Sequence, residues 1–252
     1  MQGRTRSARR FSRRAWVGAS FVIAALTCFG ALGEAAAAAS PRSDVAVARL
    51  INVTSADLPD PATWAGSVQT PNTAAQIAQA HRALRCISNR SGKISPDPFG
   101  TIGRAGGTVT ADVQSSMFAK KRTASGLPGV SSEVDFLTSS TQATKDLAAF
   151  DSKVDLSCLT ALIANVTAGE VGHKVLVNAS VTSIPHYGSG NGGVGIRFTV
   201  TGLSAPLVDV AYFYVEGRAE VSLSFVNLGT SFPTGWAHGI AARVMARAKT
   251  HV

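Results

Sequence analysis

Four segments follow one another closely in this chain: KVLVNASVT (174–182), VGIRFTV (194–200), LVDVAYFYV (207–215) and RAEVSLSFVNL (218–228). Apolar and polar residues alternate in the first, second and fourth segments, which is the period of a strand. The third segment is apolar on both sides except for Asp209, as in a central strand. We therefore expect four antiparallel strands, with one face of the sheet buried and the other exposed to solvent. Glu216-Gly217 is the expected hairpin turn between the last two.

The segments around this meander predict helices and further strands. Pro233 marks the start of a closing helix, and apolar residues at helical spacing predict helices over 43–52, 71–85, 139–151 and 156–169. Alternation predicts strands over 108–118 and 130–138. Because strands and helices are segregated along the chain, the sequence predicts an α+β fold: an antiparallel sheet of about six strands packed against helices, with one disulfide. Residues 40–252 are predicted to form a single exported domain, with two α-then-β halves as the alternative.

Residues 1–39 have the order of a secretory signal peptide. Six arginines precede the uncharged apolar stretch 15–32, and an alanine-rich segment follows, so cleavage is expected between Ala36 and Ser40. Ser12-Arg13-Arg14-Ala15-Trp16-Val17 resembles a twin-arginine signal, although the plain secretory route fits equally. An uncleaved single-span anchor is the alternative, and it would be the protein's only membrane contact. The sequence predicts a secreted or extracytoplasmic cell-envelope protein.

The charge of the chain does not favour nucleic acid as a partner. The whole chain has a formal net charge of +9, but residues 40–252 carry 18 basic and 14 acidic side chains, a net charge of +4. The basic excess lies mainly in the signal segment, so no nucleic-acid partner is expected. Lys120-Lys121-Arg122 is the one basic run in the exported part, and we interpret it as a solvated loop.

Cys86 and Cys158 are the cysteines of the exported part, because Cys28 falls in the signal segment. Outside the cytoplasm an isolated pair is most simply a disulfide. Such a bond requires Cα atoms about 4.4–6.8 Å apart. The sequence contains no C-x-x-C and no closely spaced histidine pair, so no metal site is expected.

The sequence offers little support for catalysis. Gly188–Gly193 matches G-x-G-x-x-G, but it lies between two strands, where no helix N-terminus meets a phosphate. No G-x-S-x-G occurs, and the histidines fall on different elements, with His186 in the glycine-dense loop as the one to examine. We therefore expect neither an enzyme nor a bound cofactor.

Two features of the third strand bear on ligand binding. A buried Asp209 would need a partner, for which we expect an ion pair with Arg197. Tyr212 and Tyr214 share one strand face, and with Trp236 they are the candidate ligand-binding residues. Aromatic residues on one sheet face are more often core beneath a helix, so both interpretations stay open.

Several short motifs carry a resemblance to exported actinobacterial proteins. They are Ala56-Asp57-Leu58-Pro59 with Trp64, Cys86 before Phe99-Gly100, Cys158-Leu159, and the hairpin 218–228 before Phe232-Pro233. The chain resembles the extracellular sensor domains of bacterial Ser/Thr kinases and freestanding cell-envelope lipoproteins, some of which have a PsbP-like layout. Those sensor domains tend to carry two disulfides, whereas this chain can form one.

The resemblance implies a non-catalytic, ligand-binding or sensor-like module of the cell envelope. Its expected partners are a lipid, a peptide or an envelope protein. The alternatives are a structural or protein-interaction factor without a small ligand and, third, an extracellular hydrolase. No ligand-binding residue is carried over from the resemblance.

Overall fold

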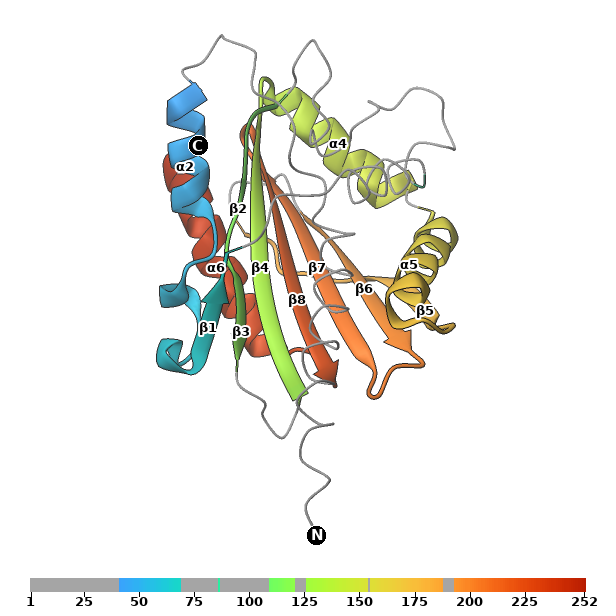
Figure 1. Ribbon diagram of the computed structural model, residues 1–252. Helices are drawn as coiled ribbons and strands as arrows, with labels where there is room; N and C mark the ends of the chain where they lie inside the picture. The colour runs from blue at the N-terminus through green and yellow to red at the C-terminus, as the bar shows by residue number, and fades with distance from the viewer. Residues whose placement is uncertain (1–40, 69–85, 87–108, 121–125, 154, 188–192) are drawn as a thin grey trace.

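The computed structural model describes residues 41–68, 86, 109–120, 126–153, 155–187 and 193–252 (Figure 1). The signal segment, the helix expected at 71–85 and residues 188–192 of the glycine-dense loop lie outside these ranges. The described elements, in chain order, are α2 (Pro41–Ile51), η1 (Ser55–Asp57), η2 (Pro61–Thr63), β1 (Trp64–Ser67), β2 (Val109–Gln114), β3 (Met117–Lys120), β4 (Gly126–Leu137), α4 (Ser140–Lys153), α5 (Leu156–Val171), β5 (Leu176–Thr182), β6 (Gly193–Thr201), β7 (Leu207–Glu216), β8 (Ala219–Gly229) and α6 (Thr234–His251).

The strands form one antiparallel sheet in the order β1-β3-β4-β8-β7-β6-β5, and β2 pairs with β4 beside β3. This confirms the α+β class, with eight strands rather than about six. The strand expected over 108–118 is two strands, β2 and β3, because the extended pairing is interrupted at Ser115. The Ser115 amide donates to the Ser132 carbonyl, and the Ser115 hydroxyl accepts from the Ser132 amide. The other additional strand is β1, which pairs with β3.

The expectation of one solvent-exposed sheet face is wrong for β4 and β8, whereas β7 is buried on both sides, as expected of a central strand. β4, β7 and β8 are buried along most of their length on both sides. One face packs against α4 and α5, and the other against α2 and α6 (Figure 1). The alternation in the sequence instead separates an apolar face beneath α6 from a face that is polar in part. The buried polar residues of β4 and β8 on that second face are Ser131, Glu133, Asp135, Glu220 and Ser224.

The turn between β7 and β8 lies one residue later than expected. Glu216 pairs with Ala219, so the two turn residues are Gly217 and Arg218. Gly217 has a φ of 54°, a conformation that favours glycine at the first position of a hairpin turn.

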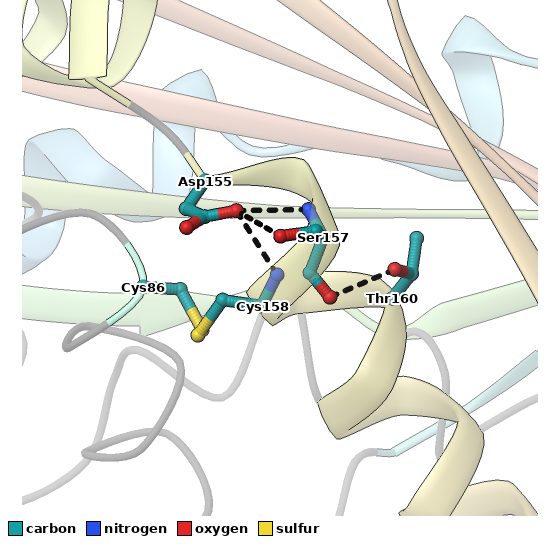
Figure 2. The surroundings of a disulfide bond; sticks show 5 residues. All are labelled: Cys86, Asp155, Ser157, Cys158 and Thr160. Carbon is teal, nitrogen blue, oxygen red and sulfur yellow. Dashed lines mark hydrogen bonds between the residues drawn. A yellow bond between two sulfur atoms is a disulfide. The ribbon is translucent and has the colours of Figure 1, made fainter.

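The predicted disulfide is present. Cys86 and Cys158 are bonded, with their Cα atoms 5.3 Å apart (Figure 2). Cys158 lies in the first turn of α5, where the Asp155 carboxylate caps the helix by accepting from the Ser157 and Cys158 amides. The Asp155 amide donates to the Cys86 carbonyl at 2.9 Å, so a backbone hydrogen bond supports the cross-link.

Asp57, from the Ala56-Asp57-Leu58-Pro59 motif, joins the two ends of the described domain. Its buried carboxylate accepts two hydrogen bonds from the Arg247 guanidinium of α6, at 2.7 and 2.8 Å. Arg247 also donates to the Ile51 and Asn52 carbonyls, at 3.1 and 2.9 Å. Arg243 donates to the Asp57 carbonyl. These bonds give the backbone carbonyls at the end of α2 hydrogen-bond donors and connect α2 to α6.

No helix among the described residues is long and apolar enough to cross a membrane.

Candidate functional site

Tyr212 and Tyr214 lie on the sheet face that α6 covers, and both are buried. The Tyr214 hydroxyl donates to the Pro185 carbonyl at 3.3 Å. Nearby, the Tyr187 hydroxyl donates to the His238 carbonyl of α6 at 2.9 Å. Burial raises the pKa of all three tyrosines, so their hydroxyls remain protonated donors at neutral pH. These contacts hold residues 184–187 against the sheet and α6, which is a structural role.

Trp236 lies apart from the tyrosine pair, in the first turn of α6. It is half-buried and packs edge-on against Trp64 of β1, with ring centroids 6.2 Å apart. Phe232 packs against both indoles, at 6.4 Å from Trp64 and 6.2 Å from Trp236. Phe225 links this group to Tyr212, with centroid distances of 5.3 and 5.1 Å. The predicted site residues therefore belong to one aromatic row, in which Tyr212 and Tyr214 are buried and Trp236 is partly exposed.

Lys120 completes the exposed end of the row. Its ammonium lies 4.7 Å from the Trp236 ring centroid and 5.8 Å from that of Trp64, within the range of a cation–π interaction. The Trp64 indole is fixed by a hydrogen bond from Nε1 to the Pro59 carbonyl at 2.8 Å. We call Trp64, Lys120, Phe232 and Trp236 the edge aromatic cluster. It combines two half-exposed indoles with a positive charge held over them.

Sequence reasoning missed Trp64 and Lys120 as parts of this site. Lys120 was expected in a solvated loop, but it is the last residue of β3, half-buried and directly opposite Trp64. The loop interpretation is wrong for Lys120, and Lys121 and Arg122 lie outside the described residues. The pairing of β1 with β3 joins segments more than 50 residues apart, and no local pattern signals it.

The expected ion pair between Asp209 and Arg197 is wrong. Phe198 is the residue opposite Asp209, and Arg197 lies opposite Val210, so the two charged side chains point to different faces of the sheet. Arg197 instead donates to the Ser231 hydroxyl at 2.6 Å. Asp209 accepts a hydrogen bond from Ser224 at 2.8 Å, and its other carboxylate oxygen, Oδ2, has no partner. Burial of the carboxylate raises the pKa of Asp209 to about 6.

Asp209→Asn is expected to stabilise the protein above pH 6. Because the pKa of Asp209 is raised on folding, its protonated form favours the folded state, and this contribution is lost as the pH rises through about 6. A shift of about two units corresponds to about 3 kcal/mol at most. Urea unfolding of both proteins from pH 4 to pH 8 should give a difference of about 2–3 kcal/mol at pH 8 that vanishes near pH 4. A constant difference across this range would contradict the assignment.

Three carboxylates also meet on the polar face of the sheet. Asp112, Glu133 and Asp135 each place one oxygen within 4.8 Å of the others, and they are the group among the described residues with the ligands for a hard cation. We assign no ion to them, because an acidic cluster alone does not define a site.

The described histidines do not form a hydrolase site. His186 is exposed and has no hydrogen bond to another described residue, and the His173 ring lies against the Val171 and Gly202 carbonyls. The His238 ring packs against Tyr212, with centroids 6.3 Å apart. Among the described residues, no histidine ring is hydrogen-bonded to a serine or a carboxylate, as a nucleophile–base pair would require.

Comparisons with known proteins give a weak structural likeness and no family. No protein-family model matches the chain, and no curated protein matches it. Among solved structures, it is similar to the extracellular domain of PknH from Mycobacterium tuberculosis, with 12% sequence identity and a TM-score of 0.34. The match covers 58% of this chain and 68% of that one. Values this low do not establish a shared family.

Proposed function

We propose that this protein is a non-catalytic module of the cell envelope that binds an anionic amphiphile, such as an acidic lipid, at the edge aromatic cluster. Its export rests on the signal-like segment 1–39, as inferred from the sequence. The observation that carries the binding proposal is the Lys120 ammonium held between two half-exposed indoles.

The cluster has the chemistry that such a ligand needs. An indole offers a broad apolar surface together with a polar edge, which suits it to the boundary between an acyl chain and a headgroup. The Lys120 ammonium can donate hydrogen bonds to headgroup oxygens while it remains over the rings. Lys121 and Arg122 follow directly in the sequence and add positive charge next to it.

Intrinsic tryptophan fluorescence tests the proposal, because in the exported form it reports on the edge aromatic cluster alone. The chain has three tryptophans, and Trp16 belongs to the signal segment, so the exported form beginning at residue 40 has only Trp64 and Trp236. Vesicles containing phosphatidylglycerol are expected to shift its emission to shorter wavelength, whereas vesicles of phosphatidylcholine alone leave it unchanged. Lys120→Glu is expected to weaken binding at least about tenfold, because it replaces attraction by repulsion of the headgroup.

Lys249→Glu is the matched control, because it makes the same charge change at an exposed position in the last turn of α6. Equal weakening by both variants would reduce the effect to net charge and contradict a site at the cluster. So would the absence of any emission shift with acidic vesicles.

A protein-interaction factor without a small ligand is the second candidate. It is favoured by a different observation: β5, the uncharged strand at the far edge of the sheet, has no strand paired to its outer side among the described residues.

A further inference from the structure

We infer that β5 is an interaction edge, and that its partner is β5 of a second copy of this chain, paired antiparallel about a two-fold axis. This inference does not depend on the proposed lipid site, which lies at the opposite end of the sheet.

The outer side of β5 is open among the described residues. The strand is last in the sheet order, and all seven of its residues, Leu176–Thr182, pair with β6 on the inner side. In the described structure nothing hydrogen-bonds to its outer side. Unpaired amide and carbonyl groups along an extended strand are a template for another strand.

β5 lacks the features that usually prevent such pairing. Its sequence, LVNASVT, has no charged residue and no proline. Leu176 and Val181 are large apolar side chains with 72% and 54% of their surface exposed. The other edge is protected better: β1 has only four residues, and the Trp64 side chain is engaged in the edge aromatic cluster.

A second copy fits this edge because the strand is self-compatible. Antiparallel pairing centred on Ala179 places Val177 opposite Val181 and Asn178 opposite Ser180 of the other copy, with no charge facing another. The helix packed on β5, α5, has Glu170 as its one charged residue, so the flanking layer adds little repulsion.

The second copy also brings a strand that is already formed. A free peptide would lose conformational entropy on becoming extended, whereas β5 of another molecule is held extended by its own sheet. The resulting contact is isologous and joins two sheets into one continuous sheet, so it closes at a dimer.

Analytical ultracentrifugation of the exported form, from micromolar to millimolar concentration, tests this inference. The wild type is expected to pass from monomer to dimer. Val181→Lys places a charge on the edge and is expected to raise the dimer dissociation constant at least tenfold, with an unchanged melting temperature of the monomer.

Val68→Lys is the control, because Val68 is 88% exposed and lies just after β1 rather than on β5. It is expected to dimerise as the wild type does. A wild type that stays monomeric throughout overturns the inference, as does a dimer that Val181→Lys leaves intact or that Val68→Lys disrupts equally. Lys120→Glu is expected to leave the dimer unchanged, so failure of the lipid site would be seen separately.

Discussion

Arg247→Ala is expected to lower the free energy of unfolding by about 3–5 kcal/mol. The substitution would leave the Asp57 carboxylate, 3% exposed as a side chain, without the bidentate partner that stabilises its charge. The Asp57 carboxylate would still accept hydrogen bonds from the Thr54 amide at 2.8 Å and hydroxyl at 3.0 Å, and Arg243 Nε would remain 3.8 Å from it, but these contacts are weaker than the bidentate pair. The Ile51 and Asn52 carbonyls would also lose their donor. Urea denaturation of both proteins measures the effect.

A double-mutant cycle separates the pair from its surroundings. Asp57→Ala alone should be destabilising to a similar degree, and adding Arg247→Ala to it should cost less than the sum of the single changes. Arg49→Ala is the control, since Arg49 is exposed near the end of α2 and should change stability by less than about 0.5 kcal/mol. Additive effects at Asp57 and Arg247 would show that the contact does not couple them.

Loss of the Cys86–Cys158 disulfide is expected to cost about 3–4 kcal/mol. The bond joins residues 72 positions apart, and chain entropy gives a long loop of this kind an effect of that size. The double variant Cys86→Ser/Cys158→Ser should therefore unfold at a lower urea concentration than the oxidised wild type.

Reduction provides an internal control for this variant. A thiol reductant should destabilise the wild type to the level of the double variant and leave the double variant unchanged. An oxidised wild type whose midpoint is insensitive to the reductant would contradict the prediction, and so would a double variant as stable as the oxidised wild type.

The closing meander was predictable because its signals are local. Three alternating segments and one segment that is apolar on both sides suffice to define β5 to β8, and the helical stripe after Pro233 defines α6. Alternation reports the polarity of a strand face and not its exposure. Glu133 and Glu220 alternate with apolar neighbours as solvent-facing residues do, yet they are 2% exposed, because the central strands are covered on both sides. The second covering layer was therefore not visible in the strand pattern.

The site was less predictable because it depends on registers between distant segments. Trp236 was among the candidate residues from the sequence, but its neighbours Trp64 and Lys120 come from strands whose pairing has no local signature. The Asp209 partner was misassigned for the same reason, since one residue of register between β6 and β7 decides which face Arg197 occupies.

The contact between Asp57 and Arg247 also determines when the chain can fold relative to its synthesis. The two residues are 190 positions apart, so α2 and the turn that follows it emerge from the ribosome long before their partner in α6 is synthesised. β4 likewise cannot form its ladder with β8, in which Gly126 pairs with Gly229 and Phe136 with Ala219, until β8 has been synthesised. Contacts of this range make folding slow and largely post-translational. The nascent chain therefore stays open until α6 has been synthesised, and an unfolded chain in that state can still be passed to another cellular machinery.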